Sequence, residues 1–359
     1  MLENFKALNT NPTNNITMDK EIRIGIIGYG KMGQIRAKHF ERKVNCEIAG
    51  VYDICLPPEV NYPVASSPDA LIADPTINAI VICLPNFLIK PTTIAALEAG
   101  KNVFCEKPPA LNMTEMQEIA SAKSRSAKIL MYGFNHRRHA AVIKMKELVD
   151  SGEMGRILWM RGRYGKSVDS NYLNGWRAEK RMAGGGILLD QGIHMLDLFL
   201  HIGNQTFDEV HAMVSSLYWQ TEGIEDNVFA IMRNSVTGMC AQLHSTMTQW
   251  RHLFSLEVFM EEGYMVLNGL KTNSGTYGDE ILTIARNRTS APAAAWQAEE
   301  RLEFKINTSW ENEAEDFIMA IQGSSSLQHG TVQDAINVMQ LIEDIYNNDT
   351  HISNSLKTT

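Results

Sequence analysis

The chain has 359 residues, 44% of them apolar, and a formal charge of −8. This length predicts two domains with separate cores, while the acidic balance and the lack of a basic run argue against nucleic acid as a partner. No uncharged apolar run is long enough to cross a membrane, and five scattered cysteines without metal-ligand spacing indicate a reduced, cytoplasmic protein with no metal site.

The predicted elements begin after residues 1–20, a flexible lead-in rich in Asn and Thr. A strand over residues 23–28 runs into a glycine-rich turn, an amphipathic helix over residues 32–42 and a strand over residues 47–52, which is followed by Asp53. The turn consists of Gly28, Tyr29, Gly30, Lys31, Met32 and Gly33.

Each glycine of this turn has a separate physical role in binding a dinucleotide. Gly28 permits a tight turn, Gly30 lets backbone approach a pyrophosphate, and Gly33 lets the helix pack closely against the strand. The free N–H groups at the helix start attract phosphates. Asp53 can accept hydrogen bonds from ribose hydroxyls, and its charge favours NAD, with NADP as the alternative cofactor. The competing interpretation is a glycine-rich turn in an unrelated α/β protein.

The following segments alternate between strands and helices. The pattern predicts strands over residues 79–84, 102–105 and 128–134 and helices over residues 68–73, 92–99, 114–127 and 139–151. The helix from residue 114 has Thr114 and Gln117 at the spacing of a capping box. This alternation predicts a doubly wound parallel sheet, a Rossmann domain, over residues 21–137. Ligands of such sheets bind at the carboxyl ends of the strands. We therefore add to the predicted cofactor site Leu84, Pro85, Asn86, Glu106 and Lys107.

The pattern changes in the second half of the chain. A strand over residues 156–164, a polar loop and a helix over residues 187–201 precede a series of strand-like segments, at residues 209–219, 226–233, 239–248, 254–260, 264–267, 280–285 and 302–306. Runs of strands without helices predict an α/β domain with a largely antiparallel open sheet over residues 138–347, for substrate binding and oligomerisation.

Two further helices, over residues 310–322 and 331–347, close this second domain. The last helix is expected to pack back on the Rossmann domain. Residues 348–359 are polar and are expected to form a loose tail.

Two positions are candidates for chemistry. In a helix over residues 187–201, Asp190, His194 and Asp197 share one face, where a carboxylate can orient an imidazole and raise its basicity. The competing interpretation is a structural hydrogen-bond network, and a metal site is disfavoured because no third ligand is near. Lys107 lies at the carboxyl edge of the sheet, where an ammonium can stabilise an alkoxide, although an exposed loop lysine would occupy the same position.

Three motifs in this order resemble the Gfo/Idh/MocA family of oxidoreductases: GYGKMG at residues 28–33, EKP at 106–108, and D-x-G-x-H at 190–194 after three glycines. The resemblance covers residues 21–347. It implies a Rossmann domain, a C-terminal α/β domain whose open sheet often mediates dimer or tetramer contacts, and Lys107 and His194 as the catalytic pair with Asp190 as orienter or proton partner.

A narrower likeness links three stretches, residues 176–198, 224–229 and 243–250, to members found in surface-polysaccharide and nucleotide-sugar pathways. One departure concerns the nicotinamide end of the cofactor site. Many members carry a histidine soon after the Pro-Asn pair, whereas Asn86 here is followed by Phe87, Leu88 and Ile89.

The function that we predict is NAD(P)-dependent hydride transfer at a hydroxyl or keto carbon of a sugar, sugar derivative or nucleotide sugar. His194 takes the hydroxyl proton, Lys107 stabilises the alkoxide, and Asp190 fixes His194 or shares the proton. Further candidates for contact with substrate, for which packing is the competing interpretation, are Asn135, Arg137, Tyr164, Trp176 and Arg177.

Two other functions remain open. A relative of the same fold can cleave glycosides by transient oxidation, with NAD regenerated. A dinucleotide-dependent regulator is disfavoured, because such a protein is expected to lose Lys107 or His194 and both are present. The expected assembly is a homodimer or homotetramer.

Overall fold

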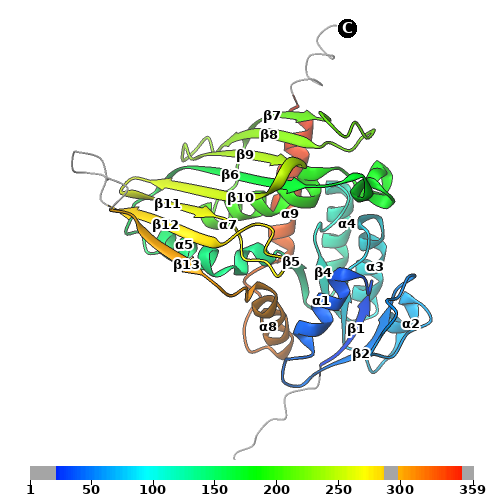
Figure 1. The fold of residues 1–359 in the computed structure, drawn as a ribbon. Coiled ribbons are helices and arrows are strands. Elements are labelled where there is room, and N and C mark those ends of the chain that lie inside the picture. The colour runs from blue at the N-terminus through cyan, green and yellow to red at the C-terminus, as the bar shows by residue number, and fades with distance from the viewer. Residues whose placement is uncertain (1–21, 287–297, 350–359) are drawn as a thin grey trace, which may run out of the picture.

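A computed structural model describes residues 22–286 and 298–349, and these form two β-sheets that lie next to each other with helices around them (Figure 1). The smaller sheet has five parallel strands in the order β2-β1-β3-β4-β5. The larger sheet has eight strands, in the order β13-β12-β11-β10-β6-β9-β8-β7. The predicted fold class, a Rossmann sheet followed by a largely antiparallel sheet, is confirmed.

The Rossmann sheet is built from short, apolar strands. Its strands are β1 (Ile22–Ile27), β2 (Cys46–Tyr52), β3 (Ala79–Ile82), β4 (Asn102–Glu106) and β5 (Leu130–Gly133). The helices between them are α1 (Lys31–Phe40), α2 (Pro68–Ala73), α3 (Asn86–Glu98) and α4 (Met113–Ser124). Every residue of β3, β4 and β5 is buried, as expected for parallel strands covered on both faces.

Two helix starts differ from the sequence prediction. Helix α3 begins at Asn86, six residues before the predicted start, and keeps Pro91 inside it because burial of Ile89 and Thr93 holds the first turns against the core. The predicted capping box on α4 is wrong. Asn112 caps this helix, because its side-chain oxygen accepts a hydrogen bond of 3.0 Å from the N–H of Glu115.

The larger sheet is antiparallel except where β6 runs parallel to β9. Its strands are β6 (Ile157–Ser167), β7 (Glu209–Ser215), β8 (Asn227–Arg233), β9 (Cys240–Thr246), β10 (Thr248–Met260), β11 (Gly263–Asn268), β12 (Glu280–Arg286) and β13 (Glu300–Phe304). The longer helices of this half are α5 (Ala140–Asp150), α7 (Ile193–Gly203), α8 (Ser309–Gln322) and α9 (Val332–Asn347).

Short helical turns connect these elements near the carboxyl edge of the Rossmann sheet. They are η1 (Asn135–Arg138), η2 (Ser170–Leu173), η3 (Trp176–Ala178), α6 (Lys180–Ala183) and the π-helical turn η4 (Leu188–Gly192). The predicted single helix over residues 187–201 is therefore a π-helical turn followed by α7.

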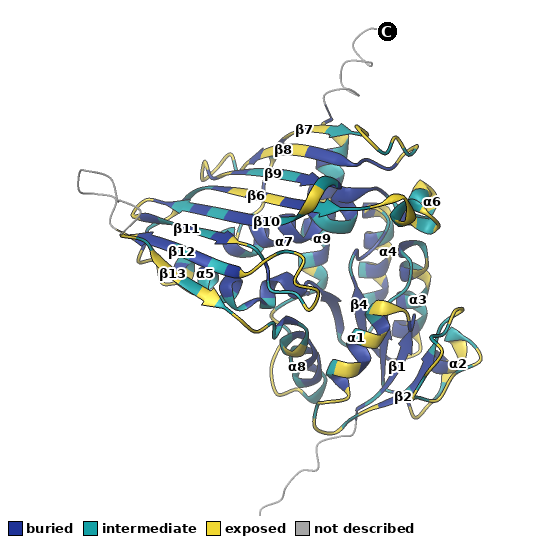
Figure 2. Ribbon diagram, in the orientation of Figure 1, coloured by how far each residue is buried: buried dark blue, intermediate teal, exposed yellow. Residues whose placement is uncertain are grey.

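One face of the larger sheet packs on helices and the other remains open. Along β8, Val228, Ala230 and Met232 are buried, whereas Phe229 and Ile231 between them are 41% and 57% exposed. Figure 2 shows this alternation of buried and exposed residues along the strands. Period-two alternation with an apolar exposed side is typical of a sheet face that packs against another surface.

Helix α9 joins the two halves. It contacts α4 and β5 on one side and α7 and β7 on the other. Helix α8 packs against α1 and η1, so the last two helices both contact the Rossmann half. The domain boundary at residues 137 and 138 remains a prediction, since one buried apolar cluster runs through both halves. None of the helices in the described segments is long and apolar enough to cross a membrane.

Candidate active site

The glycine turn has the geometry that its sequence predicts. Gly28 has a φ of +92°, and a Cβ there would lie 2.4 Å from the carbonyl oxygen of Cys83. A Cβ on Gly33 would lie 2.1 Å from the carbonyl oxygen of Gly28, so α1 packs against the turn at a distance only glycine permits. A Cβ on Gly30 would meet open space. The first N–H groups of α1 begin at this opening, which suits a pyrophosphate.

Asp53 lies beside this turn. It follows β2, and the N–H of Gly28 donates to the carbonyl oxygen of Tyr52 at 2.8 Å. One carboxylate oxygen of Asp53 accepts the N–H of Cys55 at 2.9 Å, which fixes the side chain at the end of the strand. Leu84 is also adjacent, because its backbone nitrogen lies 3.1 Å from the position of a Cβ on Gly28.

Glu106, which was predicted for the cofactor site, pairs with a buried arginine instead. Its carboxylate accepts a hydrogen bond of 2.6 Å from the buried Arg36, whose guanidinium also pairs with Glu313 at 2.8 Å. The guanidinium carbon of Arg36 lies 4.3 Å from the centre of the Phe104 ring and 4.6 Å from that of Trp310. The structure thus places Glu106 in a buried ionic network that ties α1 and β4 to α8.

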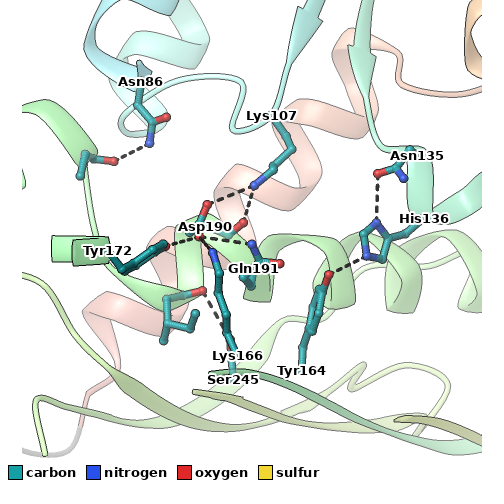
Figure 3. A network of polar contacts seen from close by, with 12 residues as sticks. Asn86, Lys107, Asn135, His136, Tyr164, Lys166, Tyr172, Asp190, Gln191 and Ser245 are labelled. Carbon is teal, nitrogen blue, oxygen red and sulfur yellow. Dashed lines mark hydrogen bonds and ion pairs between the residues drawn. The ribbon is translucent and has the colours of Figure 1, made fainter. Parts of the chain in front are cut away.

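A polar cluster gathers around Asp190, as Figure 3 shows. The Nζ of Lys107 lies 3.3 Å from Oδ1 of Asp190, and the Nζ of Lys166 lies 3.1 Å from Oδ2. The hydroxyl of Tyr172 and the amide of Gln191 also donate to Oδ2. The structure brings Lys107 and Asp190, two of the residues predicted for the site, into contact, and adds Lys166, Tyr172 and Gln191, which the sequence did not indicate.

The carboxylate of Asp190 is held in its ionised form. Burial by itself would raise its pKa, but the positive charges of Lys107, Lys166 and Arg177 lower the pKa well below the ordinary value of 3.8. Burial lowers the pKa of Lys166, and the nearby charges of Lys107 and Arg177 act in the same direction. Lys107, Lys166 and Arg177 thus all lie near the single carboxylate of Asp190.

His194 lies at the start of α7 and is 5% exposed. Its ring stacks on His136, with 3.8 Å between ring centres and 22° between planes. Burial, followed by the charge of Lys107, lowers the pKa of His194 well below 6.5, so the imidazole is neutral. A neutral imidazole can accept a proton.

Asp190 does not orient His194, contrary to the sequence prediction. No hydrogen bond joins the two side chains, and Nδ1 of His194 is buried with no partner in the part of the chain that the structure describes. Asp190 lies on the π-helical turn η4, whereas His194 lies on α7. The carboxylate faces Lys107 and Lys166 instead.

Asn135 and Tyr164 support His136, which in turn stacks on His194. One ring nitrogen of His136 lies 3.1 Å from Oδ1 of Asn135, and the other lies 2.9 Å from the hydroxyl of Tyr164. His136 was missed in the sequence, although its position directly after β5 at the carboxyl edge is a signal that could have found it.

Arg137 lies outside this cluster. It is 4% exposed, and its guanidinium donates to Asp197 at 2.6 and 2.8 Å and pairs with Asp334 at 3.1 Å. Burial raises the pKa of Asp197 to about 6 despite the charge of Arg137. Asp190 and Asp197, which were predicted to share one helix face, therefore take part in separate contacts. Through Arg137, Asp197 belongs to an ionic network that connects η1, α7 and α9.

Trp176 and Arg177 lie on η3, next to the cluster. The guanidinium of Arg177 is 4.2 Å from the centre of a Trp176 ring and 5.7 Å from that of Tyr172. Both residues line a small cavity together with Asn86 and Asp190. Asn86 also donates to the carbonyl oxygen of Ala183 at 2.8 Å, which connects the start of α3 to the segment before the three glycines. Pro85, just before Asn86, occupies the N-cap position of α3.

The remaining turn residues, Tyr29, Lys31 and Met32, flank the glycines at the start of α1. Within residues 22–286 and 298–349, no three His, Cys, Asp or Glu side chains are grouped as metal ligands.

Comparisons with known proteins agree with this architecture. A family model described as the oxidoreductase family with an NAD-binding Rossmann fold matches residues 22–134, and the GFO/IDH/MocA C-terminal domain model matches residues 142–266. The chain belongs to the Gfo/Idh/MocA family of oxidoreductases, as the motifs predicted, and residues 22–134 form an NAD-binding Rossmann domain.

Among curated relatives, the 1,5-anhydro-D-fructose reductase of Ensifer adhaerens is 31% identical over 208 residues, which make up 58% of this chain and 62% of the reductase. The myo-inositol 2-dehydrogenase of Thermotoga maritima is 26% identical over 274 residues, 72% of this chain and 79% of the dehydrogenase. The chain spans less than two thirds of the length of several curated relatives that it matches.

A solved structure of levoglucosan dehydrogenase in complex with NADH and levoglucosan is similar to this chain with a TM-score of 0.79 and 23% identity. The likeness covers 91% of this chain and 96% of the dehydrogenase. It shows that the two proteins share the whole two-sheet fold.

Proposed function

We propose that this protein transfers a hydride between NAD and a carbon that carries a hydroxyl or keto group in a sugar or sugar derivative. The observation that carries the proposal is the meeting of Lys107, a buried neutral His194 and an ionised Asp190 at the carboxyl edge of an NAD-binding sheet. The sugar oxidoreductases among its relatives support the substrate class.

In this reaction the protein moves a proton and stabilises charge. The nicotinamide of the bound cofactor accepts or supplies the hydride. His194 takes the proton of the substrate hydroxyl during oxidation and returns it during reduction, which a neutral imidazole with a free ring nitrogen can do. The ammonium of Lys107 stabilises the negative charge that develops on the substrate oxygen.

Asp190 acts through Lys107 in this proposal, which revises the role that its sequence position suggested. Its backbone oxygen and its carboxylate both accept from the Nζ of Lys107, at 2.5 and 3.3 Å, so they fix the ammonium in one place. His136 takes over the positioning of His194 through ring stacking.

We further propose a homo-oligomer that forms through the open face of the larger sheet. Three apolar side chains on neighbouring strands of that face, Met213, Phe229 and Ile231, are between 41% and 57% exposed. Burial of such a patch against a second copy would remove it from water. A cytoplasmic location is supported by the five cysteines, all of which carry free thiols.

The test of the hydride-transfer function is the absorbance of the reduced nicotinamide. Purified protein is mixed with NAD or NADP and with panels of sugars, inositols, sugar acids, nucleotide sugars and keto-sugars, and a Lys107→Ala variant is run in parallel. We expect a change of absorbance that depends on Lys107 with at least one class. Release of an aglycone without any accumulation of reduced cofactor would instead establish the redox-neutral cleavage of glycosides.

A further inference from the structure

Three cations surround one carboxylate in the active site. Lys107 and Lys166, whose side chains are 17% and 20% exposed, reach Asp190 from opposite sides, as Figure 3 shows. Arg177 is the third cation. Its charge acts on the same carboxylate, and both residues line one small cavity. Of the carboxylates in the described segments, only that of Asp190 forms an ion pair with any of these three residues.

The neighbouring rings do not offset this positive charge. Burial lowers the pKa of both His136 and His194 well below 6.5, so neither carries a charge at neutral pH. The hydride-transfer chemistry itself requires one cation, Lys107. The charges of Lys166 and Arg177 are thus in excess over what the proposed reaction and Asp190 need.

The two surplus cations both lie against the ring of Tyr172. The Nζ of Lys166 is 4.2 Å from the ring centre of Tyr172, and the guanidinium carbon of Arg177 is 5.7 Å from the same centre. Lys166 keeps donors free after its contact with Asp190, and the exposed Arg177 lines the cavity that Asp190 also lines. A guanidinium fork and an ammonium that both contact one ring are the kind of donors that bind a carboxylate or a phosphate.

We propose that the substrate is an acidic sugar, whose carboxylate or phosphate group binds Lys166 and Arg177 while its reacting hydroxyl lies between Lys107 and His194. This inference rests on the proposed hydride transfer and specifies its substrate class. An anionic substrate offsets the excess of positive charge in the site, an excess that the oxidised nicotinamide ring increases further. A neutral sugar leaves that charge uncompensated.

The test compares matched pairs of sugars on the full-length protein at low ionic strength. The pairs are glucose with glucuronate, galactose with galacturonate, and glucose with glucose 6-phosphate, so that the uronates report on a carboxylate and the phosphate on a phosphoryl group. Each sugar is measured for kcat/KM and, by calorimetric titration of the NADH-loaded protein, for binding. The variants are Lys166→Met, Lys166→Arg, Arg177→Met and, as a matched control on an exposed lysine, Lys128→Met.

We expect one acidic class to be preferred over its neutral partner by about tenfold or more, the effect of a charge-assisted hydrogen bond. Lys166→Met and Arg177→Met should abolish this preference with unchanged NADH affinity, whereas Lys166→Arg and Lys128→Met should keep it. Equal use of neutral and acidic sugars would overturn the inference and leave hydride transfer intact. So would variants that lose NADH affinity but keep the preference, because the cations would then serve the cofactor.

The binding measurement separates this inference from the proposed function. Lys166-dependent binding of an acidic sugar without any turnover, in either direction and with either cofactor, would contradict hydride transfer and support the acidic ligand. Turnover of neutral sugars alone would support hydride transfer and contradict the acidic substrate.

Discussion

Lys107 is the residue on which the proposed chemistry depends most, because its ammonium carries the positive charge. It is held by two oxygens of Asp190, and in the proposed reaction it stabilises the charge on the substrate oxygen. Loss of one such donor costs about 10²–10³-fold in kcat in other enzymes, and we expect a similar loss for Lys107→Ala. Steady-state kinetics with the substrate found by the panel measures it, together with NADH fluorescence for cofactor affinity. A variant that retains full kcat would remove Lys107 from the mechanism.

His194 provides a second prediction at this scale, concerning pH. Burial and the charge of Lys107 both lower its pKa well below 6.5, so the basic form persists as the pH falls to that value. The kcat/KM for oxidation should therefore decline only below pH 6.5. Lys107→Met removes a positive charge, so the pKa of His194 should rise and the acid limb of the remaining activity should move to higher pH.

Histidine NMR on the same proteins gives the pKa of His194 independently of activity. Lys128→Met serves as the control, since its exposed side chain lies before β5, at the other end of this strand from His136. An acid limb that stays in place when Lys107 is replaced would mean that the imidazole does not sense the ammonium.

At the scale of single elements, the start of helix α4 provides a prediction about its N-cap residue. Asn112 accepts the N–H of Glu115, whereas Thr114 lies inside the first turn. Asn112→Ala should lower the free energy of unfolding by about 1 kcal/mol, the typical value of an N-cap, and Thr114→Ala should change it far less. Urea denaturation of both variants measures the difference. The reverse order would restore the capping box that the sequence suggested.

The network of Arg36, Glu106 and Glu313 predicts how stability depends on pH. Burial raises the pKa of Glu313 from 4.5 to about 7. The charge of Glu106 acts in the same direction, while that of Arg36 lowers the pKa. Since the folded state binds this proton more tightly, the stability from Glu313 is present below pH 4.5 and is lost as the pH rises through about 7.

Glu313→Gln removes this titration while its side chain still fills the site. The unfolding free energy of the wild type should therefore fall relative to that of Glu313→Gln across the window from 4.5 to about 7. Denaturation at several pH values measures both curves. If the two curves stay parallel, the network does not titrate in this range.

At the scale of the whole molecule, the open face of the larger sheet predicts the assembly. Replacement of Phe229 and Ile231 by Asp places charges in the proposed interface, and the oligomer should dissociate. Sedimentation velocity measures the mass, and circular dichroism checks that the fold persists. Val236→Asp is the control, because Val236 is 91% exposed in the turn between β8 and β9. A wild-type protein that sediments as a monomer would contradict this assembly.

Sequence by itself determined the features of this protein that depend on neighbouring residues. Gly28, Gly30 and Gly33 define a phosphate-binding turn because their conformations and close contacts are set within one strand–turn–helix unit. The position of Lys107 at the carboxyl edge of the sheet follows from the end of a buried strand. Local patterns also indicated both sheets, since apolar periodicity reports which faces are buried.

Only the tertiary structure decided the direction in which the side chains of the site point. Asp190 lies on a π-helical turn and contacts Lys107, and the partners of Asp190 and His194 come from segments distant in sequence: Lys166 from β6, Tyr172 from η2 and His136 from η1. Long-range contacts of this kind leave no period or spacing in the chain. Charge compensation likewise decided that Glu106 pairs with Arg36 and that Arg137 pairs with Asp197, because a buried charge needs an opposite charge nearby.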